Sequence, residues 1–409
     1  MSDVSNASLN DTPSSERVHI GIFGRRNAGK SSLLNAVTGQ PLAVVSPVKG
    51  TTTDPVRKSM ELLPIGPVLL IDTPGFDDDG ELGSKRVEKT LGVLRQTDAA
   101  LLVVDATEGK SDSDRELIGL FMEHNVRFLV ALNKCDLLAS RAAPLADEIY
   151  VSAATGENIG ALKERIASLV ESEEGKLRIV GDLIFPADLV VLVTPIDKAA
   201  PKGRLILPQQ QTIRDILEAD AAAVVVKEFE LRETLENLKK PPRLVITDSQ
   251  VFAKAAADVP PEIPLTSFSI LMARYKGLLD ASVRGVRALD DVKDGDKILI
   301  SEGCTHHRQC DDIGTVKLPR WIRSYTGASP EFEFTSGGGF PENLAGAGYK
   351  LIVHCGGCML NDREMRYRQR AAQRQGVPIT NFGVLIAYTQ GILKRSLSVF
   401  PHLQAELED

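Results

Sequence analysis

The eight residues GRRNAGKS, beginning at Gly24, have the spacing of a phosphate-binding loop. They lie between an apolar run that predicts a strand and a periodic segment that predicts a helix. In that position the glycines let backbone N–H groups close around phosphates, and the helix N-terminus favours negative charge. Lys30 is placed to reach the β- and γ-phosphates, and the hydroxyl of Ser31 to bind Mg²⁺. The pattern predicts a nucleotide site.

Three later motifs favour guanine as the base. DTPG ends a strand-like run, where Asp72 can hold Mg²⁺ through water and the Gly75 amide can contact a γ-phosphate. NKCD ends another such run, and the carboxylate of Asp136 can accept the two N–H groups on the guanine edge. Adenine lacks that donor pair, so ATP would leave the carboxylate unpaired. SAATG can supply the backbone of Ala153 to the guanine oxygen.

A second group of reactive side chains lies late in the chain. Four of the five cysteines and three of the six histidines fall within residues 304–358. Two motifs hold most of them, CTHHRQC and HCGGC, and each directly follows a strand-like run. Ligands in open α/β sheets gather beyond the carboxyl ends of strands, so the two motifs can form one site. A C-x-x-C on a turn that opens a helix places two thiolates on one surface, and the helix N-terminus favours thiolate.

Cys304, Cys355 and Cys358 are the candidate thiolate ligands of this site. Three cysteines suit zinc or an iron–sulfur cluster, and the pattern alone leaves both open. The alternative is a set of buried thiols that bind nothing. The remaining coordination position could fall to Glu302, His306 or His354.

The order of apolar and periodic segments predicts an α/β protein of three domains. Residues 18–172 alternate strands and helices, which predicts a doubly wound, mainly parallel P-loop GTPase sheet. Residues 177–265 repeat that rhythm without a ligand-like constellation, which favours a packing or self-association module. Residues 266–409 carry the cysteines, so two smaller α/β domains should follow the first. Residues 1–17 are polar and predict a disordered leader.

Composition narrows the classes of partner. Of the 409 residues, 43% are hydrophobic and 25% charged, an ordinary balance for a soluble protein. Lysine plus arginine (48) minus aspartate plus glutamate (55) leaves a net charge of −7, which does not favour nucleic acid. The apolar runs are too short to cross a membrane, and the polar start resembles no secretory signal. We therefore expect a cytoplasmic protein without nucleic acid or membrane partners.

With these four motifs in order, residues 18–170 resemble GTPases of the translation-factor-related class, which includes the Era, Der and tRNA-modification GTPases. GTTTD resembles the switch I of that group, which implies Thr52 as a Mg²⁺ ligand. Asn27 matches the asparagine that helps hold K⁺ near the phosphates in potassium-activated relatives; its alternative role is a loop-stabilising amide. Phe76 stands where Ras-like proteins place a glutamine that orients water. The resemblance implies slow hydrolysis of GTP to GDP and phosphate, stimulated by K⁺.

The candidate GTPase residues fall into two overlapping sets. Those expected to take part in hydrolysis are Lys30, Thr52, Gly75 and Asn27. Those expected to contact GTP or GDP, with Ser31 and Thr52 on Mg²⁺ and Asn27 on K⁺, are Gly24, Asn27, Ala28, Gly29, Lys30, Ser31, Ser32, Thr52, Asp72, Gly75, Asn133, Lys134, Asp136, Ser152, Ala153 and Ala154.

The whole arrangement after residue 17 resembles the HydF family of [FeFe]-hydrogenase maturation GTPases. The stretches EGCTHHRQCDDIGTVKLPRW and LPQQQTIRDIL look like signatures of that family. The resemblance implies GTPase, dimerisation and cluster domains in this order, with Cys304, Cys355 and Cys358 as ligands of a [4Fe-4S] cluster. It also implies a scaffold or carrier for a diiron precursor. Its partners would be a second copy in a homodimer or tetramer, radical-SAM hydrogenase maturases and apo-[FeFe]-hydrogenase.

An exchangeable iron requires a ligand that leaves. Glu302 is the first candidate, because carboxylate is a hard ligand on a soft cluster, and His306 and His354 come next. The alternative function is a zinc-binding regulatory GTPase that acts on the ribosome or tRNA, but the 5% aromatic content and negative charge do not favour it. The arginine-rich segment 363–374 is either a solvated helix face or a docking surface for an acidic partner.

Overall fold

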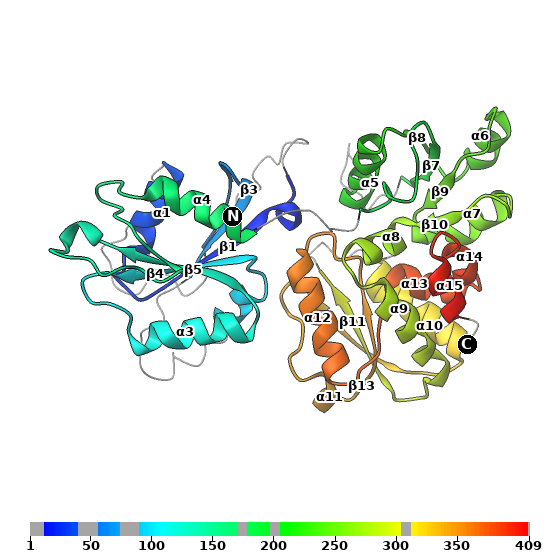
Figure 1. The fold of residues 1–409 in the computed structure, drawn as a ribbon. Helices are drawn as coiled ribbons and strands as arrows, with labels where there is room; N and C mark the ends of the chain where they lie inside the picture. The colour runs from blue at the N-terminus through cyan, green and yellow to red at the C-terminus, as the bar shows by residue number, and fades with distance from the viewer. Residues whose placement is uncertain are drawn as a thin grey trace. The chain divides into compact units, whose positions relative to one another are not determined.

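The computed structural model falls into two compact units, Met1–Glu174 and Gly175–Asp409 (Figure 1). Each unit is described by itself below. The residues that the structure describes are 12–39, 56–73, 90–170, 178–196, 205–303 and 312–407.

The first unit is built on a six-stranded sheet with the order β2-β3-β1-β4-β5-β6. Only β2 and β3 pair antiparallel, because the three residues 63–65 between them are too few for a parallel crossover. The other pairs are parallel. The strands are β1 (Val18–Phe23), β2 (Val56–Leu62), β3 (Gly66–Asp72), β4 (Ala99–Asp105), β5 (Arg127–Asn133) and β6 (Glu148–Tyr150).

Helices cover both faces of this sheet. Figure 1 shows α1 (Lys30–Thr38) and α4 (Ile159–Val170) on one side and α3 (Asp112–Glu123) on the other. Side chains of β4 point alternately to the two faces of the sheet. Leu101 packs in the core on the side of α1 and α4, and Leu102 packs in the core on the side of α3. Both faces of the sheet are therefore buried, as expected for a doubly wound fold.

The second unit contains two four-stranded sheets, both wholly parallel. The first, with the order β10-β9-β7-β8, consists of β7 (Leu189–Val193), β8 (Ala222–Val226), β9 (Leu244–Thr247) and β10 (Leu265–Ser267). The second, with the order β12-β11-β13-β14, consists of β11 (Lys297–Glu302), β12 (Glu331–Ser336), β13 (Tyr349–His354) and β14 (Ile379–Asn381).

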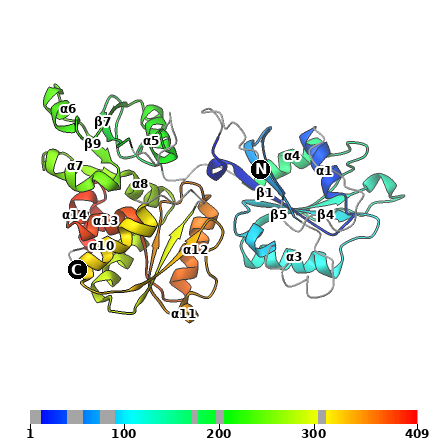
Figure 2. The same ribbon diagram turned by 180° about the vertical axis from the view of Figure 1, so that it is seen from behind.

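Helices enclose the sheet that holds β11 and β13. Figure 2 shows α12 (Asp362–Arg374) on one side of it and α10 (Leu318–Thr326) and α13 (Phe382–Thr389) on the other. Ile352 packs toward α12, and its neighbour Val353 packs toward the opposite core.

No helix in the described ranges is both long and apolar enough to cross a membrane. The helices of this unit are α5 (Leu207–Glu218), α6 (Leu231–Asn237), α7 (Phe252–Asp258), α8 (Phe268–Tyr275), α9 (Leu279–Val286), α10 (Leu318–Thr326), α11 (Leu344–Ala347), α12 (Asp362–Arg374), α13 (Phe382–Thr389), α14 (Leu393–Ser396) and α15 (Pro401–Glu406).

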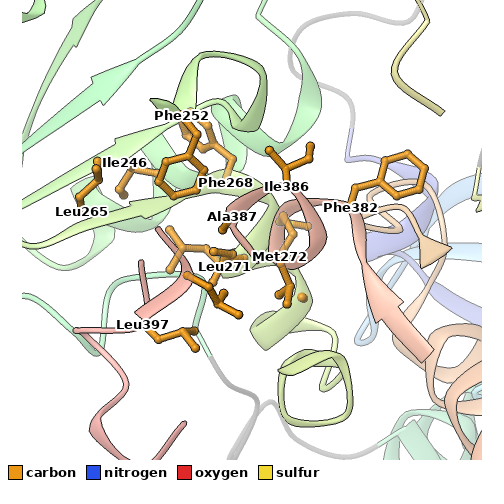
Figure 3. Packing of buried hydrophobic residues seen from close by; sticks show 14 of the residues in the cluster. Ile246, Phe252, Leu265, Phe268, Leu271, Met272, Phe382, Ile386, Ala387 and Leu397 are labelled. Atoms are coloured by element: carbon orange, nitrogen blue, oxygen red, sulfur yellow. The ribbon is translucent and has the colours of Figure 1, made fainter. Parts of the chain in front are cut away.

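The two sheets of the second unit share one hydrophobic core. Figure 3 shows Phe252 of α7 and Leu271 of α8 packed with Ile386 of α13. The domain boundary expected at residue 265 was wrong, because it cuts through β10, which pairs with β9. Helix α8 contacts both α5 and α13, so the segment that connects the two sheets is itself part of the core that they share.

The expected leader also ends earlier than residue 17. Residues Ser14–Glu16 form a short 3-10 helix, and Ser15 is buried. The carbonyl oxygen of Ser14 lies 2.8 Å from Nε2 of His19 in β1, and Arg17 donates to a carbonyl of β2. Polar composition misled the prediction here, because polar side chains can bind strand edges. Residues 1–11 lie outside the described residues.

Candidate functional site

The loop between β1 and α1 has the geometry of a phosphate cradle. Asn27 and Gly29 have positive φ values of 64° and 89°, which turn the backbone around the ammonium of Lys30. Lys30 Nζ donates to the carbonyl oxygens of Gly24 and Arg25, each at 2.7 Å. Gly29 occupies the N-cap position of α1 and has no side chain to cap it. The first N–H groups of α1 are therefore suited to bind an anion.

Asn133, at the end of β5, connects three of the nucleotide motifs. It is 2% exposed, and its Nδ2 donates to the carbonyl oxygen of Ala28 at 3.0 Å. Its Oδ1 accepts from the amide of Ala153 at 3.1 Å. A Cβ at Gly29 would lie 2.3 Å from Asn133 Nδ2, so the loop approaches this closely only because residue 29 is glycine. One buried amide thus joins the phosphate loop, NKCD and SAATG.

Lys134 of NKCD is held by Asp105, at the end of β4. Lys134 has a φ of 64°, and its Nζ lies 2.5 Å from Asp105 Oδ2. Thr107 donates to the other carboxylate oxygen through both its amide and its hydroxyl. Burial disfavours the charged form of Asp105, but these hydrogen bonds outweigh it and lower the pKa of Asp105. Asp136, two residues after Lys134, is exposed.

We did not anticipate Asp105 from the sequence. The available signal was its position, since it closes the apolar run AALLVVD as Asp72 closes its own run. Of the remaining nucleotide candidates, Ser152 is buried and its Oγ accepts from Thr155 N at 3.1 Å, while Ser32 and Ala154 are exposed.

The chemistry of Asp72 fits a magnesium site. Its Oδ1 is buried and has no hydrogen-bond partner within the described residues. Burial raises the pKa of Asp72, and the charge of Lys30 opposes that shift. Ser31 is the second residue of α1, directly after Lys30. A hydrated cation would supply the missing partner for Oδ1. The other candidates here, Thr52 and Gly75, lie outside the described residues.

The HCGGC motif forms a turn directly after β13. The amide of Cys355 donates to Ser301 O of β11 at 3.0 Å, which pins the turn to the neighbouring strand. The sulfur of Cys355 accepts backbone N–H groups from Gly303 at 3.0 Å and Gly357 at 3.4 Å. Gly357 has a φ of 65°, and a Cβ there would lie 2.5 Å from the sulfur of Met365. Backbone donors at a sulfur favour thiolate, so this turn suits a metal ligand.

Burial nevertheless disfavours the thiolate form of both cysteines when no metal is bound. Burial raises the pKa of Cys355. Burial and the neighbouring Cys355 raise the pKa of Cys358 to about 11. A metal would have to displace these protons. No three acidic, cysteine or histidine side chains gather closely enough for a metal within the described ranges, and both Cys304 and His306 lie outside them.

The expected helix does not open at the C-x-x-C motif. Helix α12 begins at Asp362, and Asn361 caps it by accepting from the amide of Glu364 at 3.1 Å. That N-terminus is therefore satisfied locally, and Gly303 and Gly357 supply N–H groups to Cys355 instead. The prediction failed because the turn continues past Cys358 before the helix begins.

Glu302 ends β11 and is 6% exposed. Its carboxylate packs over Gly314, where a Cβ would lie 2.6 Å from Glu302 Oε1. Its charge acts on Cys355 and contributes to the raised pKa of that thiol. Glu302 therefore lies on the same edge of the sheet as the cysteine turn.

His354 should be removed from the candidate ligands. Its Nδ1 lies 2.7 Å from the carbonyl oxygen of Cys355, and its Nε2 lies 3.0 Å from Nη1 of Arg368. Burial and the charge of Arg368 lower the pKa of His354 to about 3, so the ring is neutral. Both nitrogens already have partners, which leaves no lone pair for a metal.

Arg368 is the residue that sequence reasoning missed at this site. It belongs to the arginine-rich segment but is 1% exposed, whereas Arg366, Arg370 and Arg374 are exposed. The signal was its spacing, since Arg363, Arg366, Arg370 and Arg374 share one helix face and Arg368 does not.

We predict that Asn133→Ala weakens GDP binding by about 1–3 kcal/mol, because it leaves the Ala28 carbonyl and the Ala153 amide without their partner. Fluorescent GDP titration of the full chain measures the change. Ser168→Ala, which removes an exposed hydrogen bond from α4, is the control and should bind as wild type. An unchanged GDP affinity in Asn133→Ala would contradict the role assigned to this amide.

Comparison with known families follows the same division of the chain. The family model described as "Hydrogen maturase F dimerization domain" matches residues 179–277. The model described as "Hydrogen maturase F tetramerization domain" matches residues 280–399. A third model, "50S ribosome-binding GTPase", matches residues 19–134. The first two matches meet just after α8, where the structure passes from one sheet to the other.

The individual relatives are GTPases. GTPase Der of Thermomicrobium roseum is 37% identical over 171 residues, covering 36% of this chain and 37% of that protein. The tRNA modification GTPase MnmE of Dechloromonas aromatica is 37% identical over 166 residues, covering 38% and 36%. The chain therefore spans little more than a third of the length of these curated relatives.

Among solved structures, Era of Aquifex aeolicus bound to GDP and aluminium fluoride is 21% identical, with a TM-score of 0.34. That match covers 51% of this chain and 93% of the Era chain.

The two hydrogen maturase F matches span most of the second unit and follow a GTPase match in the first. The chain thus belongs to the hydrogen maturase F family of hydrogenase maturation GTPases.

Proposed function

We propose that this protein is a GTP-hydrolysing scaffold or carrier that binds a [4Fe-4S] cluster and assembles or delivers the diiron precursor to apo-[FeFe]-hydrogenase. Radical-SAM hydrogenase maturases would supply that precursor. The observation that carries the proposal is the HCGGC turn, in which the Cys355 sulfur accepts two backbone N–H groups. This turn lies in the unit that matches hydrogen maturase F.

In the GTPase unit we assign the candidate residues the following tasks. The first N–H groups of α1 and the ammonium of Lys30 would bind the phosphates, and Ser31 and Asp72 would hold Mg²⁺, Asp72 through water. Asp136 selects guanine, at about 1.5–3 kcal/mol for each charge-assisted hydrogen bond. Thr52 and Gly75, outside the described residues, would complete the switch segments.

In the second unit Cys304, Cys355 and Cys358 would hold three irons of the cluster, and Glu302 would be the exchangeable ligand of the fourth. When bound, the cluster supplies an iron that can accept a new ligand. Cys355 is oriented by Gly303 and Gly357, and Glu302 approaches from the end of the adjacent strand β11. The alternative is a zinc-binding regulatory GTPase that acts on the ribosome or tRNA, and the match of residues 19–134 to a ribosome-binding GTPase model is the observation in its favour.

Anaerobic purification and reconstitution of the full chain should yield about four irons and four sulfides per chain, with an EPR signal after reduction. Glu302→Ala should keep the cluster but change its spectrum, because the fourth iron loses its carboxylate. Asp312→Ala, which removes a nearby carboxylate that caps the next helical turn, is the matched control. Tightly bound zinc without iron would contradict the proposal and support the alternative.

We propose that K⁺ stimulates hydrolysis through Asn27. Asn27 is exposed, and its backbone φ of 64° belongs to the turn of the phosphate loop. Hydrolysis should be slow, and faster in KCl than in NaCl at equal ionic strength, with the difference lost in Asn27→Ala. Phosphate release measures the rates. Equal rates in the two salts would refute this proposal.

Self-association is proposed to use the edge of β8. Among the described strands β8 pairs only with β7, and it presents the uncharged sequence AAVVV at the edge of its sheet. Val225 is 43% exposed, and Phe229, shortly after the strand, is 75% exposed. An apolar, unpaired edge is a ready template for a second chain.

Val225→Lys should therefore convert dimers to monomers, because a buried lysine at a strand edge opposes pairing. Light scattering after size-exclusion chromatography reports the mass. Met122→Lys, on an equally apolar exposed position of α3, should leave the mass unchanged. A Val225→Lys protein that stays dimeric would place the interface elsewhere.

A further inference from the structure

The guanidinium of Arg368 is buried at the carboxyl end of β13, the strand that the cysteine turn follows. Its side chain is the largest of the fully buried side chains in the described residues. Nε donates to Glu364 Oε1 at 2.9 Å, and Nη2 donates to the carbonyl oxygen of Gly337. The guanidinium carbon lies 5.1 Å from the ring centre of Phe340. These contacts hold the buried guanidinium in place.

The same guanidinium reaches the ends of three adjacent strands. Nη1 lies 3.0 Å from Nε2 of His354, the last residue of β13, and 3.5 Å from the hydroxyl of Ser301 near the end of β11. Gly337 directly follows β12. Strands β12, β11 and β13 are neighbours in the sheet, so Arg368 joins their carboxyl ends. Two of these strands lead directly into the candidate metal site.

The contact with Arg368 determines which nitrogen of His354 carries the proton. A guanidinium has only donors, so Nε2 must accept and is unprotonated. The proton of the neutral ring therefore resides on Nδ1, which donates to the carbonyl oxygen of Cys355. The amide of Cys355 is bound in turn to Ser301 O. Both peptide groups of Cys355 are thus held, and its sulfur is left facing Gly303 and Gly357.

We propose that Arg368 is a positioning residue for the metal centre, acting through His354 to orient the Cys355 ligand. This inference rests on the proposed function for the identity of the bound group, and it assigns to His354 a supporting role in place of ligation. Outer partners of metal ligands commonly change metal affinity 10- to 100-fold when they are lost.

The test uses Co²⁺ as the probe, added anaerobically to the full-length apo protein, with the sulfur-to-cobalt absorption as the readout. Arg368→Gln is made together with Glu364→Gln, so that no buried carboxylate is left without its cation. Glu364→Gln alone and Arg370→Gln, an exposed arginine of the same helix, are the controls. Circular dichroism confirms that each variant is folded.

We expect the paired variant and His354→Leu each to bind Co²⁺ 10- to 100-fold more weakly and to change the absorption band in the same way. A variant that combines Arg368→Gln, Glu364→Gln and His354→Leu should bind Co²⁺ no more weakly than the paired variant or His354→Leu, because both sets of changes remove the same support of Cys355. Arg370→Gln should match wild type. Arg368→Lys, which can still donate to His354, should recover part of the affinity.

Wild-type Co²⁺ affinity in a folded Arg368 variant would overturn the inference. Additive losses from Arg368 and His354 would also overturn it, since the two would then act separately. A wild-type chain that binds Co²⁺ as expected but takes up no iron–sulfur cluster would refute the proposed function and leave the positioning role supported. A wild-type chain that gives no sulfur-to-cobalt absorption would refute both.

Discussion

Parallel strands deliver their carboxyl ends to one edge of a sheet, and this constraint organises both units of the protein. In the first unit β1 leads into the phosphate loop, β3 ends at Asp72 and β5 ends at Asn133. In the second, the ends of β11 and β13 lead into Gly303 and Cys355. The helices that return the chain occupy the faces of the sheets, so the loops at this edge are free to carry chemistry.

Each edge is held by one buried polar side chain that bonds to several loops. Asn133 does so in the GTPase unit and Arg368 does so beneath the cysteine turn. Loss of one partner from a buried charged pair such as Arg368 and Glu364 costs about 3–5 kcal/mol, because the other charge stays buried. Such groups resist displacement, and the loops that they bind are correspondingly well positioned.

Most of the strands and the nucleotide motifs could be predicted because they depend on local patterns. Apolar runs indicated the strands before the phosphate loop, DTPG and NKCD, which are β1, β3 and β5, and motif spacing located the phosphate loop. The antiparallel β2, the ordered Ser14–Glu16 turn and the core shared around α8 were not predicted. The turn before β1 and the core around α8 depend on contacts between segments distant in sequence, which hydrophobic periodicity does not record. Strand β2 forms a hairpin with its neighbour β3, but most of its residues are polar and not buried, so it contains no apolar run.

The chemical inventory can be read from the residues alone: a phosphate loop, motifs typical of guanine binding, and cysteines placed after two strands. The roles of His354 and Arg368 follow instead from contacts made in the folded chain. A histidine beside a C-x-x-C resembles a ligand until both of its nitrogens are seen to be bonded. An arginine in a basic helix resembles a surface residue until its burial is known. Residue type limits the possible chemistry, whereas burial and hydrogen-bond partners determine which possibility is realised.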